Sequence, residues 1–419
     1  MFERIIGYDN VKKELSVVID MVVNRKKYQK LGANLVNGIL LHGEPGTGKT
    51  TFASEFITAC GIGAFTVRKD RPADEFLSHI KKTFEEAKKA APSIVFLDDM
   101  DKFTDDAHPY NSEEFSTVQA CIDEVKGSGV LILATANDIE DFPDSLLRAG
   151  RFDIIIPIDN PNLNDAQRIV KHYLNERGFG ENLDCEEIAR LLDGGSCAQL
   201  ESVINEAVII AAYDGREEIN NDDVLQAAMR VIYDSPSNAA STGNRYSLEI
   251  AYHEAGHAIV SEILEPGSVN LISIKRGNSS GGFTSYKQSD DYFTSVDCME
   301  NRIIALLAGK AANDVVFGKV DVGCSRDLDR AYRIATRFVD DYCAYGFTSW
   351  EGITHGSSTE LKNRKETLVS YEIQKYYLKA KRILIENRKF LDFIVNDLMN
   401  KGVVTYRRIQ EIKAELSAT

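Results

Sequence analysis

The sequence predicts a multidomain α/β plus α fold: a module with a parallel sheet and flanking helices, a helical segment, and then a mainly α-helical domain. Its 419 residues are too many for one hydrophobic core. Short apolar runs alternate with helical patterns in the first part, as in α/β folds. A small, polar stretch with Pro and Gly then interrupts the pattern. We therefore predict domains at 1–158, 159–234 and 248–419, with a linker at 235–247.

The composition excludes several classes of protein. A hydrophobic content of 43% and a charged content of 27% are typical of globular chains. The net charge of −15 argues against a nucleic-acid partner, which would need a basic excess. No apolar run approaches the roughly 20 residues of a membrane span, and the N-terminus lacks a signal pattern. Seven scattered cysteines without a C-x-x-C pair suit a reduced compartment, so a cytoplasmic location is expected.

A glycine-rich loop follows the first buried apolar run, Gly38–Leu41, and precedes a helical pattern at Thr51–Phe56. Its spacing, G-x-x-x-x-G-K-T, is that of the phosphate-binding loop, and the flanking strand and helix argue against a chance turn. Backbone N–H groups would face phosphate oxygens, while Lys49 would add positive charge and Thr50 would offer its hydroxyl to Mg²⁺. ATP and Mg²⁺ are the predicted ligands. The predicted binding residues are Gly43, Glu44, Pro45, Gly46, Thr47, Gly48, Lys49, Thr50 and Thr51.

Two further apolar strands end in polar side chains. Ser93–Leu97 is followed by Asp98 and Asp99, and Val130–Thr135 leads to Asn137. Downstream of a phosphate loop, Asp98 is expected to hold Mg²⁺, usually through water, and Asp99 to polarise the water that attacks the γ-phosphate. Asn137 is placed to position that water. Taken alone, the acid pair would equally suit a turn at a strand end.

Two arginines, Arg148 and Arg151, follow three residues apart. A planar guanidinium donates several hydrogen bonds and suits the charge that develops on a transferring phosphoryl group. The alternative is a solvated surface pair, which is the usual fate of arginine.

The run from Phe2 to about Asp153 resembles an AAA+ ATPase module, because these motifs come in that family's order. The resemblance implies that Asn137 is the sensor residue. It also implies that Arg148 and Arg151 act as fingers on a neighbouring subunit's ATP, and hence a homo-oligomeric ring, usually a hexamer. Residues 159–234, which are helical in pattern from 164 to 233, resemble the family's lid.

Beyond the linker, the helical run Ile250–Val260 carries the pattern H-E-x-x-H. The i,i+4 spacing places His253 and His257 on one face, where both imidazoles can bind one Zn²⁺. Glu254 lies beside them and can take a proton from a water at the metal. The alternative is a pair of solvent-facing helix histidines.

Two histidines do not complete a catalytic zinc site, which needs a third protein ligand. His355 is the only histidine downstream, so a carboxylate is the better candidate. Asp327 begins a helical pattern, but Asp321 and Asp329 are neighbours. Helix capping is the alternative role for Asp327.

The whole chain resembles the FtsH family of ATP-dependent zinc metalloproteases. Ala251–Ala258 matches that family's peptidase helix, and Ala308–Ala312 and Ser325–Leu328 match its later landmarks. The resemblance implies that Asp327 is the third zinc ligand and Glu254 the general base. It implies that an ATP-driven ring pulls unfolded or misfolded proteins through a pore for cleavage. Residues 360–415 are helical in pattern and resemble the family's C-terminal helical part.

The chain departs from the family pattern in three ways. The family is anchored by N-terminal membrane spans, whereas this chain begins at the ATPase module and is expected to be soluble. The family's acidic strand ends Asp-Glu, whereas this one ends Asp98-Asp99, so slower ATP hydrolysis is expected. The family's pore loop is aromatic-x-glycine, whereas Arg68–Phe76 is polar and shorter. Phe76 is a possible substitute grip, but a core position in the next helix is favoured.

Three interpretations therefore stay open. The leading one is an ATP-dependent zinc endopeptidase. The second is a zinc peptidase whose ATPase half is a slow nucleotide switch, favoured by Asp99 and the altered pore stretch. The third is a non-proteolytic AAA+ remodeller, against which the intact H-E-x-x-H motif and Asp327 argue.

Overall fold

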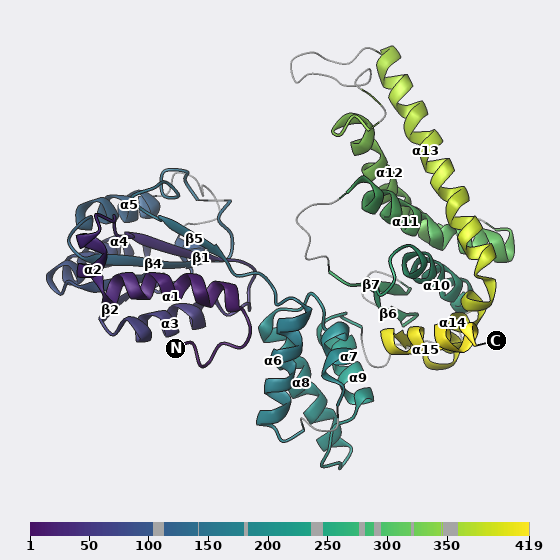
Figure 1. Cartoon of the computed structure of the whole chain (residues 1–419), viewed down its shortest axis with the longest axis horizontal. Helices are drawn as coiled ribbons and strands as arrows, with labels where there is room; N and C mark the ends of the chain where they lie inside the picture. The colour runs from purple at the N-terminus through teal and green to yellow at the C-terminus, as the bar shows by residue number, and fades with distance from the viewer. Residues whose placement is uncertain are drawn as a thin grey trace. The chain divides into compact units, whose positions relative to one another are not determined.

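The structure, a computed structural model, describes residues 1–103, 113–140, 142–179, 183–235, 246–275, 281–288, 295–319, 322–344, 346 and 359–418. The chain forms two compact units (Figure 1). The first unit consists of Met1–Leu183 and Gly194–Asn205, and the second of Asp184–Asp193 and Glu206–Thr419. The domain boundaries at 158, 234 and 247 stay predictions, and most of the expected linker lies outside the described residues.

The first unit is built on a five-stranded parallel sheet with the strand order β2-β3-β4-β1-β5. The strands are β1 (Gly38–His42), β2 (Gly63–Val67), β3 (Ser93–Leu97), β4 (Val130–Ala136) and β5 (Ile154–Pro157). The three apolar runs expected from the sequence, Gly38–Leu41, Ser93–Leu97 and Val130–Thr135, are confirmed as β1, β3 and β4. Since all strands are parallel, the polar residues after β1, β3 and β4 meet at one edge of the sheet.

Helices cover both faces of this sheet (Figure 1). Alternate strand residues enter two separate cores: Leu40 and Ile132 pack with α4 and α5, whereas Ile39 and Leu133 pack with α1 and α3. Burial on both faces explains why these strands read as continuous apolar runs. The helices are α1 (Asp9–Val23), α2 (Arg25–Lys30), α3 (Lys49–Cys60), α4 (Ala73–Lys89), η1 (Met100–Phe103) and α5 (Glu113–Val125).

The stretch predicted as a lid is helical, as expected. Its helices are α6 (Leu163–Glu176), α7 (Cys185–Leu191), α8 (Cys197–Tyr213) and α9 (Asn221–Val231). The start of α9 is fixed by a capping box, in which Asn220 and Asp223 each accept the other's backbone N–H. Arg216 donates two hydrogen bonds of 2.6 Å to the buried Asp223 carboxylate.

The rest of the second unit is mainly helical and carries a small antiparallel sheet of order β7-β6-β8. The helices are α10 (Ser247–Leu264), α11 (Val296–Phe317), η3 (Val322–Cys324), α12 (Ser325–Asp340), α13 (Thr359–Glu386), α14 (Arg388–Lys401) and α15 (Tyr406–Ser417). The strands are β6 (Val269–Ser273), β7 (Phe283–Tyr286) and β8 (Val403–Thr405). The expected helices are confirmed, and the sheet was not anticipated.

Helices α10 and α11 cross at close range. A Cβ on Gly256 would lie 2.7 Å from the Ala308 carbonyl oxygen and from the Ala312 methyl group. Only glycine therefore allows this approach, which sets the middle of α10 against α11. Among the described residues, no helix has the length and apolar character that crossing a membrane requires.

Candidate functional site

The phosphate-binding loop depends on glycine for its backbone shape. Gly43, Gly46 and Gly48 have φ values of 147°, 86° and 97°, which disfavour other residues. A Cβ on Gly43 would also lie 2.2 Å from the Ile158 carbonyl oxygen. Lys49 and Thr50 follow as the first residues of α3, so the loop and the helix N-terminus together form an anion-binding cradle.

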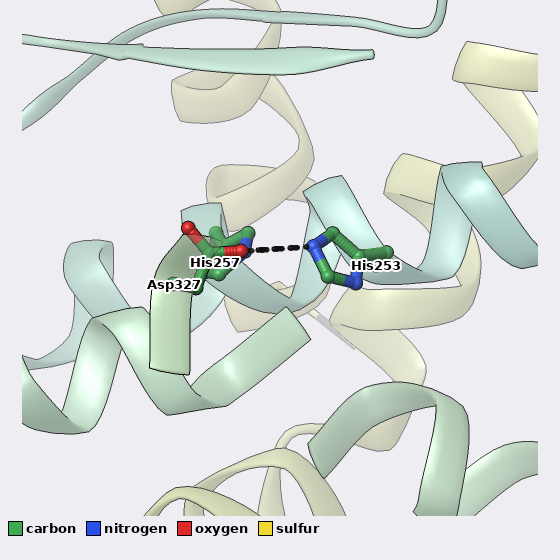
Figure 2. A group of neighbouring side chains, drawn as sticks. All are labelled: His253, His257 and Asp327. Atoms are coloured by element: carbon green, nitrogen blue, oxygen red, sulfur yellow. Dashed lines mark hydrogen bonds and ion pairs between the residues drawn. The ribbon is translucent and has the colours of Figure 1, made fainter. Parts of the chain in front are cut away.

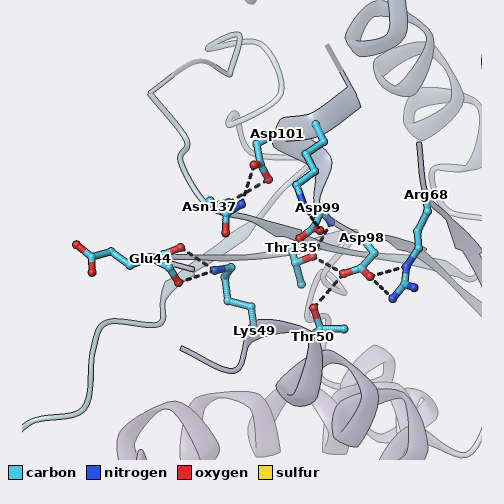
Figure 3. Close-up of polar contacts among 11 residues, drawn as sticks. Glu44, Lys49, Thr50, Arg68, Asp98, Asp99, Asp101, Thr135 and Asn137 are labelled. Carbon is cyan, nitrogen blue, oxygen red and sulfur yellow. Dashed lines mark hydrogen bonds and ion pairs between the residues drawn. The ribbon is translucent and has the colours of Figure 1, made fainter. Parts of the chain in front are cut away.

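Lys49 reaches back across this loop. Its ammonium donates to the carbonyl oxygens of Gly43 at 2.7 Å and Glu44 at 2.8 Å, and the side chain is buried (Figure 3). Burial lowers the pKa of Lys49, while the carboxylates of Asp101 and Asp99 oppose that shift. The buried cation suits the phosphate-binding role expected from the motif.

Asp98 follows the last residue of β3 and is buried. Its two carboxylate oxygens accept hydrogen bonds from different partners. Oδ1 accepts from the hydroxyls of Thr50 at 3.2 Å and Thr135 at 2.8 Å. Oδ2 accepts from Arg68 Nε at 2.7 Å (Figure 3). The structure therefore brings Asp98 and Thr50 together, as the Mg²⁺ prediction requires, and adds Arg68 and Thr135, which the sequence did not indicate.

The neighbouring Asp99 has a left-handed backbone, with φ of 53°. Its N–H donates to the Thr135 hydroxyl at 2.9 Å, and its carboxylate accepts from Lys102 at 2.7 Å. Asn137, at the tip of β4, is held by Asp101, whose carboxylate accepts from the Asn137 backbone N–H at 3.0 Å and side-chain amide at 2.9 Å (Figure 3). No sequence pattern indicates Lys102 or Asp101 as partners of these residues.

The two predicted arginine fingers differ in their surroundings. Arg148 is exposed. Arg151 donates through Nε and Nη2 to Asp123, at 3.1 and 2.8 Å, and through Nη1 to the Ser145 carbonyl. Arg151 is thus oriented within its own subunit, whereas Arg148 is available at the surface.

A pocket of about 120 Å³ lies beside the phosphate loop and was missed by the sequence analysis. Its lining includes Ile6, Tyr8, Thr51, Phe52, His172, Tyr173 and Cys197. Tyr8 donates to the Asp159 carbonyl at 2.9 Å and lies 3.4 Å from Cys197 Sγ, and burial raises the pKa of both groups. Apolar and aromatic walls next to phosphate-binding groups suit a nucleotide base.

The second unit holds the predicted metal ligands. His253 and His257 project from α10, and Asp327 projects from the first turn of α12 (Figure 2). The two Nε2 atoms are 3.1 Å apart, and Asp327 Oδ2 lies 3.4 Å from each. Burial alone would raise the pKa of Asp327, but hydrogen bonds with His253 and His257 outweigh it and hold that pKa well below its usual value. Two imidazoles and one carboxylate are a donor set that zinc favours.

Two features next to the cluster, the hydrogen bond of His257 Nδ1 and the glycine at position 309, are compatible with a bound metal ion. His257 Nδ1 donates to the Ala305 carbonyl at 2.7 Å, which leaves Nε2 with its lone pair toward the cluster. Gly309 of α11 lies against both imidazoles: a Cβ there would be 2.5 Å from His257 Nε2 and 2.7 Å from His253 Nε2. Glycine thus keeps the space beside the ligand atoms open, so the residues present fit a bound zinc ion.

The other candidates for the third zinc ligand either pair elsewhere or lie outside the described residues. Asp329 is exposed and pairs with Arg333 at 2.6 Å. Asp321 and His355 lie outside the described residues. Among the described residues, His253, His257 and Asp327 are the group that could hold a metal ion, with ligand atoms all within 4.8 Å of one another.

Glu254 is buried beside this cluster. Its Oε2 accepts from the hydroxyl of Thr284 on β7 at 2.9 Å. Burial raises the pKa of Glu254, and the neighbouring His257 and His253 oppose the shift. A carboxylate with a raised pKa next to a metal site is suited to proton transfer.

Comparison with known proteins agrees with both sites. Residues 39–160 match the model of the ATPase family associated with various cellular activities (AAA), and residues 241–412 match peptidase family M41. The chain is 32% identical over 432 aligned positions to the ATP-dependent zinc metalloprotease FtsH 2 of Thermoanaerobacter sp. (strain X514), covering 99% of this chain and 83% of that protein. The chain belongs to the FtsH family.

Other FtsH proteins match over the same extent. An FtsH of Thermotoga maritima is 31% identical, with 99% of this chain and 73% of that protein covered. FtsH 2 of Phytoplasma mali is 30% identical, with 98% of this chain and 62% of that protein covered. These relatives are named as ATP-dependent zinc metalloproteases, so Zn²⁺ and ATP with Mg²⁺ are the cofactors of the family.

The stretch predicted at the family's pore-loop position is short and makes contacts within its own module. Between β2 and α4 it is the polar segment Arg68–Pro72. Phe76, the possible substitute grip, is fully buried and meets Phe103 edge to face at 5.0 Å. Phe76 is therefore a core residue, as the sequence favoured.

Proposed function

We propose that this chain is an ATP-dependent zinc metalloendopeptidase that acts on unfolded or misfolded proteins. The observation that carries the proposal is the zinc cluster: His253, His257 and Asp327 converge, and Gly309 leaves the room that a metal needs. Membership of the FtsH family supports the coupling of this site to ATP.

The peptidase roles follow from the contacts around the cluster. When bound by His253, His257 and Asp327, zinc supplies a Lewis acid that polarises the peptide carbonyl. Glu254 acts as general base, because it is buried beside the histidines and its raised pKa favours accepting a proton. Thr284 holds the Glu254 carboxylate through Oε2, and Oε1 takes no part in this hydrogen bond.

We infer that the substrate chain binds along the free edge of strand β7. This strand is an edge strand of the three-stranded sheet, and its Thr284 contacts the catalytic carboxylate. An extended peptide that adds to this edge would bring a backbone carbonyl to the zinc ligands. Such binding uses main-chain hydrogen bonds and needs an unfolded substrate, because folded chains have few free strand segments.

The nucleotide roles are assigned to the first unit. The loop Gly43–Thr50 and Lys49 bind the phosphates, Asp98 and Thr50 hold Mg²⁺, and the pocket beside Tyr8 takes the base. Asp99 polarises the attacking water, and Asn137 positions it.

The arginines imply assembly. We assign Arg148 and Arg151 as fingers that reach the ATP of a neighbouring copy, which requires a homo-oligomeric ring, most simply a hexamer. Arg148 is exposed, as a residue that serves a neighbour must be. A cytoplasmic location is proposed as well, supported by seven scattered cysteines without a C-x-x-C pair.

A second function is favoured by specific contacts: a zinc peptidase whose ATPase half is a slow nucleotide switch. Lys102 forms an ion pair with Asp99, whose side chain is shorter than the glutamate usual in the family. The segment Arg68–Pro72 contacts its own module through Arg68, and the aromatic residue that follows it, Phe76, is buried and does not face a substrate. A remodeller without peptidase activity is not favoured, because the zinc ligands and Glu254 are assembled.

The test is cleavage of fluorescent casein by the full chain with zinc, with and without ATP. Glu254→Gln and Lys49→Ala are compared with the unmodified chain. Cleavage that needs ATP and is lost in both variants supports the coupled protease. Cleavage that survives Lys49→Ala supports the switch, and absence of cleavage under every condition contradicts both.

A further inference from the structure

Arg68, the first residue after β2, neutralises the acid that is expected to hold Mg²⁺. Its Nε donates to Asp98 Oδ2 at 2.7 Å, and its Nη2 contacts the same oxygen. Figure 3 shows Arg68 on one side of the Asp98 carboxylate and Thr50 on the other. The Asp98 carboxylate is therefore already paired with a guanidinium cation.

The segment that presents Arg68 is held against the nucleotide edge by a second basic residue. Lys69 Nζ donates to the Phe103 carbonyl at 3.0 Å and lies 3.9 Å from the Glu114 carboxylate. Further along, Arg71 pairs with Asp70 at 2.8 Å. Two residues of this segment, Arg68 and Lys69, thus tie it to the module, and Arg68 does so through Asp98.

We propose that Arg68 competes with Mg²⁺ for the charge of Asp98, and so sets the Mg²⁺ concentration that nucleotide binding requires. This inference rests on the proposed role of Asp98 in the nucleotide site. Mg²⁺ is held by few protein groups and depends on the full negative charge of the carboxylates near it. A guanidinium on the same carboxylate removes much of that charge.

The two partners differ in exposure, which makes the exchange feasible. Asp98 is 4% exposed, so nearby charges act on it with little screening. The Arg68 side chain is 59% exposed, so its guanidinium can return to water at small cost. Arrival of Mg²⁺ with the nucleotide therefore releases Arg68 and loosens the segment that begins with it.

The first experiment measures binding of a fluorescent ATP analogue to the full chain as MgCl₂ is titrated. Arg68→Gln removes the charge and keeps a polar side chain of similar length. We expect it to lower the Mg²⁺ concentration at half-maximal binding by about three- to tenfold. Arg71→Gln removes the same charge from the same segment without touching Asp98, and should stay within about twofold of the unmodified chain.

The opposite result overturns the proposal. If Arg68→Gln needs as much Mg²⁺ as the unmodified chain, or more, then Arg68 only holds Asp98 in position. If the unmodified chain binds no nucleotide at any Mg²⁺ concentration, the proposed nucleotide site itself fails, which is a distinct outcome.

A second measurement needs no variant. In the unmodified chain with ADP, hydrogen exchange of the amides at 69–71 should quicken when Mg²⁺ replaces EDTA, because the Asp70 N–H to Arg68 carbonyl hydrogen bond of 3.0 Å belongs to the released segment. Unchanged exchange, measured against the amides of β4 as an internal reference, would mean that Arg68 stays on Asp98.

Discussion

The Thr284 hydroxyl donates to Glu254 Oε2 at 2.9 Å and lies 3.2 Å from the Glu254 backbone carbonyl oxygen. One side chain on β7 therefore holds the carboxylate that we assign as general base on α10. Because the hydroxyl engages one carboxylate oxygen, the carboxylate is held in one orientation. The small sheet thereby contributes to the site although it supplies no metal ligand.

This contact predicts a loss of turnover when the hydroxyl is removed. Thr284→Val keeps the side-chain volume and should lower kcat for peptide cleavage roughly tenfold, with little change in KM, since the base loses its orientation. Thr284→Ser should retain most of the activity. Equal kcat values for the valine variant and the unmodified chain would assign Thr284 a packing role only.

The close packing around Gly309 predicts that a larger residue at this position lowers zinc binding. In Gly309→Ala, the new methyl group would lie within van der Waals radii of both imidazoles, so we expect at least a tenfold drop in bound zinc, measured by atomic absorption on the purified chain. Gly63→Ala is the control, because a Cβ there meets nothing within 4 Å. Full zinc content in Gly309→Ala would show that α11 can move away.

The short side chain of Asp99 predicts a slow rate of ATP hydrolysis. A side chain one methylene longer should raise that rate. The carboxylate is one methylene shorter than the glutamate usual in the family and is paired with Lys102 at 2.7 Å. Asp99→Glu should increase phosphate release several-fold at saturating ATP, since the longer side chain reaches the attacking water. Lys102→Gln should give a smaller increase because that ion pair is exposed. A rate for Asp99→Glu at or below that of the unmodified chain would contradict this explanation.

The lid predicts a pH-dependent contribution to stability. Hydrogen bonds from Arg216 hold the pKa of Asp223 below its usual value. A carboxyl whose pKa is lowered on folding stabilises the fold above its unfolded pKa of about 4, and this contribution disappears as pH falls through the folded pKa. Asp223→Asn should therefore cost about 1 to 2 kcal/mol at pH 7 and much less near pH 3.

Urea unfolding followed by circular dichroism at both pH values checks this prediction. The exposed neighbour Asp222 supplies the control, and Asp222→Asn should cost less than half as much at pH 7. A deficit for Asp223→Asn that stays constant with pH would exclude the ion pair as its source.

The sequence predicted those parts of the sites that depend on local spacing. His253, Glu254 and His257 follow from the i,i+4 geometry of one helix, and the glycines of the phosphate loop follow from its backbone shape. Asp327 could be chosen among neighbouring acids only by resemblance, because α12 is positioned by packing on α11 and α13, which local spacing does not encode.

Contacts between strands and between helices were not predictable. Arg68 reaches Asp98 because β2 pairs with β3 in the register Val67 to Leu97, and no local pattern specifies that neighbour. The role of Gly309 depends on how closely α11 approaches α10. Strand β8 has only three residues, inside a stretch whose periodicity is helical.

The convergence of His253 and His257 from α10 with Asp327 from α12 gives zinc a second task. An ion that bridges two helices distant in the chain acts as a reversible cross-link, and its binding energy adds to the folding free energy in proportion to the logarithm of the free zinc concentration. The peptidase would then lose structural cohesion together with activity as zinc becomes scarce. A cell short of zinc would hold this protease in a form that is both inactive and more readily degraded.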